Sequence, residues 1–256
     1  MTDWVKGVVS GCSHWTNNLF SLRVDADMLP FEAGQYTWLA PGNVDETGVE
    51  QSAQPYSILS APGAPVLEFF FYTRTEGDLS KQLSSLNAGD QLWVKRAAAG
   101  TLTLSQLRDA DTLCLLATGT GVAPFLSMLK TAEPWQRFQK IVLVYAVRQN
   151  QDLRYQELYD DLHSRYPGRF QLIAFVSREV PSTRLMPFAI QGHIPESLQN
   201  GTLETLLDLE FNPTNTQFML CGNPGMVKDA VSVLQQRGFS DNKPALSGEL
   251  TYEAYW

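Results

Sequence analysis

The second half of the chain is organised around the stretch Ala117-Thr118-Gly119-Thr120-Gly121-Val122-Ala123-Pro124, which follows directly on an apolar run that begins at Leu113. Glycines let the backbone turn tightly and approach a ligand closely, and Pro124 suits the first turn of a helix. A strand that passes into a helix through such a turn offers backbone amides and the positive end of the helix dipole to anionic groups. The alternative interpretation is a tight turn that binds no ligand.

Apolar runs and amphipathic segments alternate around this turn, from about residue 108 onward. The runs at 113–117, 141–146, 172–176 and 218–221 are typical of strands that are buried on both faces. Helical spacing recurs in two segments, in Tyr155, Leu158, Tyr159 and Leu162 and in Val227, Ala230, Val231 and Leu234. The alternation predicts a parallel sheet with helices on its faces, and such a sheet binds its ligand beyond the carboxyl ends of its strands.

A second short motif follows the last of these apolar runs. It reads Cys221-Gly222-Asn223-Pro224-Gly225-Met226 and opens the second predicted helix. Taken alone, it is equally well interpreted as a buried cysteine followed by a helix start. Its place at the end of a strand in the same sheet as the first glycine turn favours a ligand crevice that both motifs share.

The first half of the chain, up to about residue 100, has a different rhythm of short strands and turns. The segments 35–39 and 67–73 are rich in aromatic and apolar residues, and Gly and Pro residues separate them from their neighbours. This pattern predicts a small antiparallel barrel. A helical pattern of Leu79, Leu83 and Leu86 follows Asp78, which is a plausible N-cap.

Three further features of the sequence are candidates for ligand binding. Gln54-Pro55-Tyr56-Ser57 places an aromatic ring and a hydroxyl side by side, although an ordinary strand end is the favoured local interpretation. Residues 77–80 begin the helix of the first half, where a pyrophosphate can bind. The chain ends in Tyr255-Trp256, two large aromatic residues that either contact a ligand or pack on the protein's own core.

Length, charge and cysteine content limit the classes of function. A chain of 256 residues predicts two domains of about 100–150 residues each. A formal net charge of −8 argues against a general nucleic-acid-binding protein, which needs a basic face. Cys12, Cys114 and Cys221 have no CxxC spacing, which argues against a disulfide framework, a metal site or a cysteine-ligated iron–sulfur cluster.

The sequence also carries expectations about location. No apolar run reaches the roughly 18–20 residues that cross a bilayer. The first residues lack the basic-then-apolar pattern of a secretory signal. We therefore expect a cytoplasmic protein that does not bind membranes.

Taken in order, these motifs resemble those of the ferredoxin–NADP⁺ reductase family, and most closely its bacterial ferredoxin/flavodoxin–NADP⁺ reductases. The series comprises Tyr56-Ser57, Gly77-Asp78-Leu79-Ser80, the glycine turn at 118–124, Ser177-Arg178-Glu179, Cys221-Gly222-Asn223-Pro224-Gly225-Met226 and Tyr255-Trp256. It spans nearly the whole chain, and the full set in this order is far more specific than any single motif.

The resemblance implies a two-domain enzyme that transfers electrons between NADPH and a one-electron carrier, ferredoxin or flavodoxin. Residues 1–105 would form an FAD-binding antiparallel β-barrel, and residues 106–256 an NADP(H)-binding α/β domain with a parallel sheet. The C-terminal aromatic tail of the second domain would return to the flavin. A monomer is the state that the resemblance implies.

The same resemblance assigns roles to individual residues. The FAD site would comprise Gln54, Pro55, Tyr56, Ser57, Tyr72, Asp78, Leu79, Ser80, Thr120, Tyr255 and Trp256. The NADP site would comprise Gly119, Thr120, Gly121, Val147, Arg148, Ser177, Arg178, Arg184, His193, Cys221, Gly222 and Met226. Ser57, Cys221 and Tyr255 would lie beside the reacting atoms. Tyr255 would cover the flavin until nicotinamide displaces it, and Arg178 would pair with the 2′-phosphate.

The chain departs from the family pattern at two positions. The family usually has an arginine two residues before the flavin-facing tyrosine, where this chain has Gln54, so we expect weaker retention of FAD unless a cation such as Arg74 compensates. Bacterial relatives carry an arginine where this chain has His193, and a histidine supplies less positive charge than an arginine at pH 7. We therefore expect a reduced preference for NADPH over NADH, with Arg178 and possible help from Arg184 maintaining it.

Other functions share parts of this pattern. A free-flavin reductase and an NAD(P)H reductase that feeds an oxygenase have the same two-domain plan, and the aromatic tail favours the ferredoxin or flavodoxin partner. A flavin-binding regulator without turnover is a further alternative, which bleaching of the flavin by NADPH would exclude. An electron-transfer subunit with an added iron–sulfur cluster is disfavoured because three scattered cysteines cannot supply four ligands.

Overall fold

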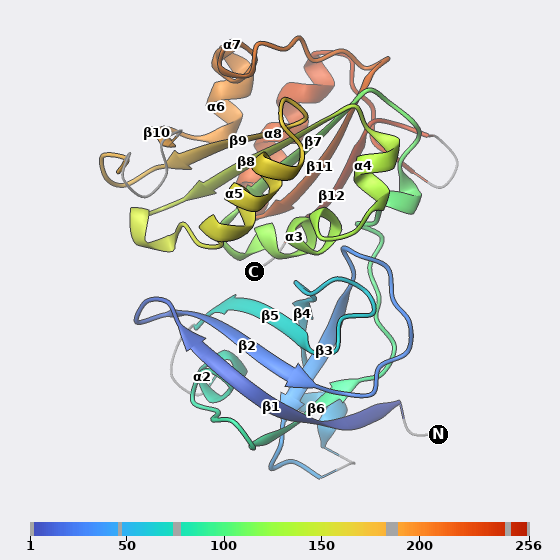
Figure 1. The fold of residues 1–256 in the computed structure, drawn as a ribbon, viewed down its shortest axis with the longest axis vertical. Coiled ribbons are helices and arrows are strands. Elements are labelled where there is room, and N and C mark those ends of the chain that lie inside the picture. The colour runs from blue at the N-terminus through green and yellow to red at the C-terminus, as the bar shows by residue number, and fades with distance from the viewer. Residues whose placement is uncertain (1–2, 46–47, 74–77, 183–188, 244–246, 255–256) are drawn as a thin grey trace. The chain divides into compact units, whose positions relative to one another are not determined.

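The computed structural model describes residues 3–45, 48–73, 78–182, 189–243 and 247–254. Arg184, Tyr255 and Trp256, together with Arg74 and Gly77, lie outside the described residues. The chain divides into two compact units (Figure 1). The first unit comprises residues 1–103 and 123–131, and the second comprises residues 104–122 and 132–256.

The first unit is built on a six-stranded antiparallel sheet that curls into a nearly closed barrel. The strands are β1 (Trp4–His14), β2 (Leu19–Asp25), β3 (Tyr36–Pro41), β4 (Gln54–Ser57), β5 (Leu67–Tyr72) and β6 (Gln91–Lys95), and they lie in the order β4-β3-β6-β1-β2-β5. The two edge strands meet where Ile58 bridges Phe69 and where Leu59 N donates to the Glu68 carbonyl at 2.8 Å. The predicted antiparallel barrel is confirmed.

The barrel is filled by apolar side chains from alternate strand positions. Leu22, Leu39, Ile58 and Phe69 are fully buried inside it. Helix α2 (Leu79–Ser84) packs Leu79 and Leu83 into the same cluster, as the helical pattern predicts. A second short helix, α1 (Val49–Ser52), was not predicted, because four residues are too few to show a helical period.

The second unit is built on a six-stranded parallel sheet. Its strands are β7 (Thr112–Thr118), β8 (Lys140–Val147), β9 (Phe170–Val176), β10 (Ala189–Gln191), β11 (Thr216–Gly222) and β12 (Leu250–Ala254), in the order β10-β9-β8-β7-β11-β12. All five pairings are parallel. The predicted parallel sheet is therefore confirmed, and β10 and β12 are edge strands that the sequence analysis did not identify.

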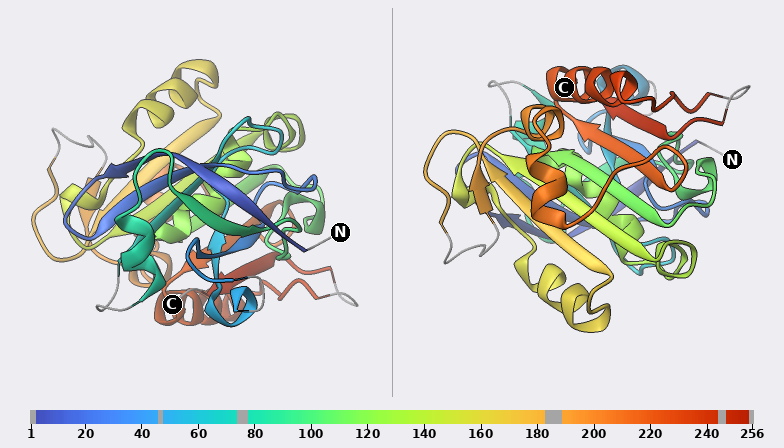
Figure 2. Two further views of the ribbon diagram at one scale, coloured as in Figure 1. Left: turned by 90° about the horizontal axis from the view of Figure 1, so that it is seen from below. Right: turned by 90° about the horizontal axis from the view of Figure 1, so that it is seen from above.

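Helices cover both faces of this sheet (Figure 2). One face packs against α6 (Ile194–Gln199), α7 (Thr202–Leu207) and α8 (Pro224–Gln236), and it shares one apolar cluster with them. The opposite face carries α4 (Glu133–Arg137) and α5 (Gln156–Arg165), where Trp135 stacks on Tyr166 with ring centroids 3.7 Å apart.

The two predicted amphipathic helices differ in how closely the observed helices agree with the sequence pattern. In α8, all four predicted positions are buried. In α5, Tyr159 and Leu162 are buried, but Tyr155 lies outside the helix with a left-handed φ of 69°. The expectation that Tyr155 belongs to the helical stripe is wrong, because the chain leaves the preceding turn in a conformation that cannot join a right-handed helix.

Helix α3 (Ala123–Leu129) follows the glycine turn but packs with the first unit. Ser127 Oγ donates to the Ser60 carbonyl at 2.7 Å, and Lys130 Nζ donates to the Leu59 carbonyl at 3.3 Å. Pro124 lies in the first turn of this helix, as predicted. A division of the chain at residue 105 does not anticipate that a helix from the second half completes the first unit.

Candidate functional site

Most of the predicted nucleotide-binding residues lie at one edge of the second unit, beyond the carboxyl ends of its strands. The register pairs Thr118 with Ala146, Val147 with Val176 and Ala117 with Cys221. Gly119, Thr120 and Gly121 follow β7 in the 3₁₀ turn η2 (Gly119–Val122), Arg148 follows β8, Ser177 and Arg178 follow β9, and Cys221 and Gly222 end β11. The structure thus brings together residues that are up to about a hundred positions apart in the sequence.

The topology reverses at this edge between β7 and β11. The chain places β8, β9 and β10 on one side of β7, and then β11 and β12 on the other. In sheets of this kind, the crevice where the order reverses is the usual ligand site. The two glycine motifs follow the two strands that border it.

The backbones of the two glycine motifs are in close contact. A Cβ atom on Gly121 would lie 2.5 Å from the Cys221 carbonyl oxygen. Gly222 has a φ of +132°, and a Cβ atom on it would lie 2.2 Å from Thr118 Oγ1. The same Thr118 hydroxyl accepts a hydrogen bond from Asn223 N at 2.8 Å. The floor of the crevice is therefore bare backbone, which a dinucleotide can approach closely.

Cys221 and Met226 both lie close to this floor, but neither is open to solvent. Cys221 is fully buried in β11 and forms no disulfide. Met226 is buried in the first turn of α8, whose N-terminal amides are already engaged, since Asn223 Oδ1 accepts from Gly225 N at 2.9 Å and from Met226 N at 3.2 Å. The Asn223 side chain therefore already occupies two of the backbone N–H groups at the N-terminus of α8 that an anion would otherwise bind.

Arg148 and Arg178 lie side by side at this edge. Ser177 N donates to the Val147 carbonyl and Arg178 N to the Arg148 carbonyl, both at 3.0 Å, so the pairing of β8 and β9 continues past the strands. Both arginines are exposed, and no carboxylate within the described part of the chain lies within ion-pair distance of either. Two exposed arginines on adjacent strand ends, without an ion-pair partner among the described carboxylates, are suited to binding a phosphate.

His193 lies at the same edge, because β10 runs parallel to β9 and ends two residues before it. It is exposed at the N-cap position of α6, and its side chain makes no capping hydrogen bond. His193 is thus a surface residue at the start of a helix, and its side chain does not cap that helix. Its carbonyl accepts from Ser197 N at 3.1 Å.

The predicted flavin-binding residues of the first unit lie on β4, on β5 and at the start of α2. Gln54 and Pro55 are exposed, Tyr56 is half-buried and Ser57 is buried on β4, an edge strand paired to β3. The Tyr56 ring meets Phe71 edge to face at 5.5 Å. Tyr72, the last residue of β5, is half-buried.

The start of α2 has the predicted N-cap. The Asp78 carboxylate accepts from Ser80 N at 3.4 Å, and Leu79 and Ser80 are buried. Because this carboxylate already stands at the helix N-terminus, a phosphate bound there would lie close to a negative charge. Gln54 is uncharged, so it supplies no positive charge to the predicted flavin site of the first unit.

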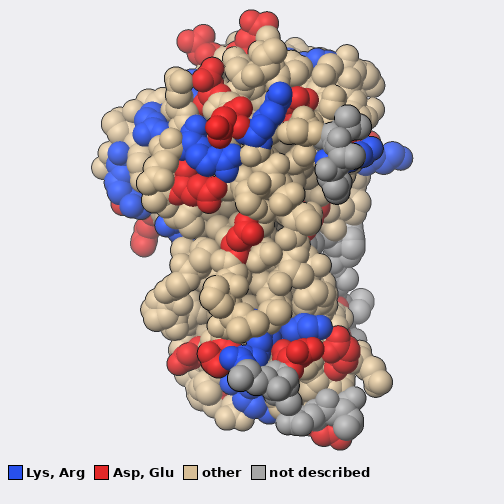
Figure 3. Space-filling model, turned by 90° about the vertical axis from the view of Figure 1, so that its right-hand side faces the viewer, with Lys and Arg blue, Asp and Glu red and all other residues tan. Residues whose placement is uncertain are grey.

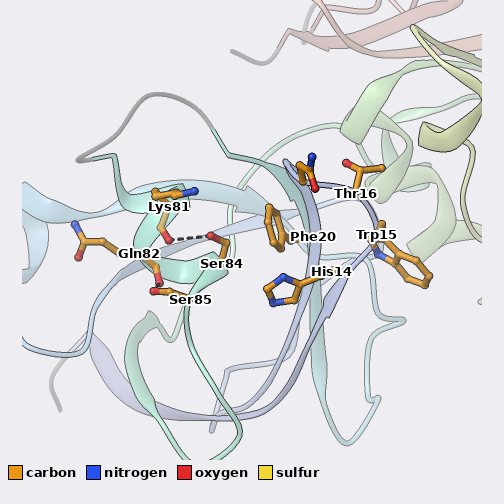
Figure 4. A pocket seen from close by; sticks show the side chains of 9 residues that line it. His14, Trp15, Thr16, Phe20, Lys81, Gln82, Ser84 and Ser85 are labelled. Atoms are coloured by element: carbon orange, nitrogen blue, oxygen red, sulfur yellow. Dashed lines mark hydrogen bonds between the residues drawn. The ribbon is translucent and has the colours of Figure 1, made fainter.

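A groove of about 740 Å³ in the first unit is separate from these residues (Figure 4). It lies between α2, which contributes Lys81 and Ser84, and the end of β1 with the turn that follows, which contribute His14 and Thr16. None of the residues that the resemblance assigns to a cofactor lines it.

Surface charge is mixed on the face that Figure 3 shows. Basic and acidic side chains are interspersed there within each unit, and neither unit presents a broad surface of one sign on that face. Within the described residues, no helix has the length and apolar character of a membrane span, and no group of three or more His, Cys, Asp or Glu side chains could hold a metal ion.

Comparison with known proteins places this arrangement in a family. The flavodoxin/ferredoxin–NADP reductase of Escherichia coli (strain K12) is 38% identical over 257 residues, and that of Shigella flexneri is 39% identical; each alignment covers 100% of both chains. The chain belongs to the flavodoxin/ferredoxin–NADP reductase family. Its residues 115–232 also match the family described as the oxidoreductase NAD-binding domain.

Solved structures agree with membership of the reductase family. A ferredoxin NADP⁺ reductase from Neisseria gonorrhoeae, solved with bound FAD and NADP, has a TM-score of 0.90 at 27% identity and covers 99% of both chains. The FAD/NAD-binding domain of the nitric oxide dioxygenase of Vibrio cholerae has a TM-score of 0.73 at 18% identity over 98% of each chain, which shows a shared fold alone. The two-domain reductase fold predicted from the sequence is confirmed.

Proposed function

We propose that this reductase is an FAD-dependent oxidoreductase that transfers electrons between NADPH and a one-electron carrier protein, ferredoxin or flavodoxin. The observation that carries the proposal is the carboxyl edge of the second sheet, where a bare glycine floor lies beside two exposed arginines that have no ion-pair partner among the described carboxylates. Full-length similarity to flavodoxin/ferredoxin–NADP reductases supports the assignment of substrate and partner.

The second unit would bind NADP(H). Gly119, Gly121 and Gly222 leave room for the backbone to approach the nucleotide, and Thr120 lies half-buried between the first two. Arg148 and Arg178 would hold the 2′-phosphate, with Ser177 between the strand end and Arg178. The proposed site would also include Val147, His193, Cys221 and Met226. It would include Arg184 as well, which lies outside the described residues.

The first unit would bind FAD. Tyr56 would lie against the isoalloxazine ring, with Ser57 and Tyr72 beside it, and Asp78, Leu79 and Ser80 would face the pyrophosphate. Tyr255 and Trp256 would contribute the aromatic rings of the tail. When bound, FAD and NADPH supply the hydride and one-electron chemistry, and the chain's residues bind and orient them.

Two finer points belong to the same proposal. We expect Arg148 and Arg178 to maintain a preference for NADPH, although His193 supplies less positive charge than the arginine of bacterial relatives. We also propose a monomer that works in the cytoplasm. Light scattering on the purified protein tests the monomeric state.

The experiment that tests the function is anaerobic rapid mixing of the purified flavoprotein with NADPH or with NADH, followed by flavin absorbance. We expect rapid bleaching by NADPH, slower bleaching by NADH, and recovery of the absorbance when oxidised flavodoxin is added. Equal rates with both nucleotides would contradict the NADPH preference. A yellow protein that neither nucleotide bleaches would contradict the enzymatic assignment and favour a regulator.

A further inference from the structure

Asn150 joins two loops at the carboxyl edge of the second sheet. It is the first residue of the 3₁₀ turn η3 (Asn150–Asp152), two residues beyond Arg148. Its Nδ2 donates to the Val180 carbonyl at 2.9 Å, and its Oδ1 accepts from Ser182 N at 2.7 Å. Its backbone N–H donates to the Glu179 carboxylate. One residue of the loop after β8 thus holds three residues of the loop after β9.

These contacts continue the cross-strand bonds that place the arginine pair. Ser177 and Arg178 are bonded to the backbone of β8 and its next residue, and the Asn150 contacts begin at the residue after Arg178. Arg178 therefore lies between two fixed points, the strand end before it and the Asn150 contacts after it. The Glu179 carboxylate accepts from the Asn150 backbone N–H, so the negative charge of the residue that follows Arg178 is already engaged.

The side chain of Asn150 is not needed to hold its own turn. A reciprocal capping box closes η3, in which the Gln149 side chain accepts from the Asp152 backbone and Gln149 N donates to Asp152 Oδ2 at 3.3 Å. Both hydrogen-bonding atoms of the Asn150 amide bond the loop after β9 instead. This arrangement indicates a role in placing that loop.

We propose that Asn150 is a positioning residue for recognition of the nucleotide 2′-phosphate: its side chain fixes the loop after β9 so that Arg178 stays beside Arg148. This inference rests on the proposed function, in which the two arginines bind that phosphate. Removal of the side-chain amide would break the bonds to Val180 and Ser182 and leave the loop after Arg178 held only by the Glu179 carboxylate on the Asn150 backbone N–H. An Arg178 with more freedom must be ordered when the phosphate binds, and that ordering costs affinity.

The test uses two small ligands and the purified full-length protein. Adenosine 2′,5′-bisphosphate carries the 2′-phosphate and adenosine 5′-monophosphate lacks it, so calorimetric affinities for the two separate phosphate recognition from general nucleotide binding. For Asn150→Ala we expect about fivefold weaker binding of the bisphosphate and less than about twofold change for the monophosphate, as for the loss of ordinary hydrogen bonds.

Two further variants make the result decisive. Gln151→Ala is the matched control, because the exposed Gln151 side chain bonds to Gln149 within its own turn and to no other residue that the structure describes. We expect this variant to bind both ligands like the parent. Arg178→Met tests the site itself and is expected to weaken bisphosphate binding more than Asn150→Ala does. Thermal unfolding of each variant shows whether it folds like the parent.

The outcomes separate the two hypotheses. If Arg178→Met weakens bisphosphate binding while Asn150→Ala binds normally, the positioning role is wrong and the NADP site stands. Equal losses for both ligands in Asn150→Ala would also overturn it, because the residue would then support the fold in general. If Arg178→Met has no effect on either ligand, the proposed phosphate site is wrong, and the role of Asn150 fails with it.

Discussion

The backbone of Gly121 lies so close to Cys221 that a Cβ atom on the glycine would be 2.5 Å from the cysteine carbonyl oxygen. The contact joins the turn after β7 to the end of β11, the two strands between which the order of the sheet reverses. Because the neighbouring atoms are backbone, they cannot move aside as a flexible side chain would. The crevice floor therefore depends on the absence of a side chain at residue 121.

The first prediction concerns this contact. We expect Gly121→Ala to lower the free energy of unfolding by about 1–3 kcal/mol, as overpacking does, and to raise the KM for NADPH. Denaturant unfolding and steady-state kinetics measure the two effects. Gly48→Ala is the control, because its Cβ atom would be 3.5 Å from the nearest side chain, an ordinary contact. A Gly121→Ala variant with the parent's stability would contradict the tight packing.

The second prediction concerns the arginine pair. We expect Arg148→Met and Arg178→Met each to raise the KM for NADPH about tenfold or more, with little change for NADH, because each loses hydrogen bonds to a charged phosphate. Arg165→Met removes the same charge from α5, where Arg165 pairs with Asp161, and should leave both KM values unchanged. Equal losses for NADPH and NADH would mean that the arginines do not recognise the 2′-phosphate.

The third prediction concerns Lys130. Burial lowers the pKa of its ammonium group below the usual 10.5, although the nearby Glu68 carboxylate acts in the opposite direction. The charged ammonium is thus less favourable in the folded protein than in the unfolded chain. This cost is fully present below the lowered pKa and disappears as the pH rises from that value to 10.5. We therefore expect wild-type protein to gain stability relative to Lys130→Met over this range.

Denaturant unfolding of both proteins at pH 7 and at steps up to pH 10.5 measures the effect of Lys130. Lys140→Met is a suitable control, because it makes the same substitution at a lysine in the other unit, at the start of β8. A stability difference between wild-type protein and Lys130→Met that does not change with pH would show that the ammonium is not destabilised by burial.

Much of the fold follows from short-range sequence patterns. The buried strands of the parallel sheet show as apolar runs because both their faces are covered, and α8 shows because its four buried residues repeat at helical spacing. The edge strands β10 and β12 were missed because one side of an edge strand has no partner and its sequence is correspondingly mixed. Tyr155 fits the helical spacing, yet its backbone is left-handed, and spacing alone does not show that.

The sequence indicates only in part where the residues of the candidate site lie in the fold. Glycine-rich turns have a local signature, and they marked the strand ends where Gly121 and Gly222 lie. Arg178 was assigned by the family resemblance alone. Asn150 was missed because its partners are about thirty positions away in a loop without periodicity. The packing of α3 against the first unit was missed for the same reason, since Ser127 and Ser60 meet only in the folded chain.

The fourth prediction concerns Gln54, the residue that stands where the family usually has an arginine. It is exposed at the start of β4, so a longer side chain can be accommodated there without repacking the barrel core. We expect Gln54→Arg to bind FAD about tenfold more tightly, because the guanidinium can form a charge-assisted bond to a flavin phosphate. Fluorescence titration of the apoprotein with FAD measures the affinity.

The control for Gln54→Arg is Gln51→Arg, which adds the same charge at an exposed position of the neighbouring helix α1. If both variants tighten FAD binding equally, the effect is general electrostatic attraction of an anionic cofactor to a less acidic protein. A tenfold gain for Gln54→Arg alone would place a flavin phosphate beside β4. No gain for either would mean that another group already neutralises that phosphate, and would contradict the expectation that glutamine weakens FAD retention.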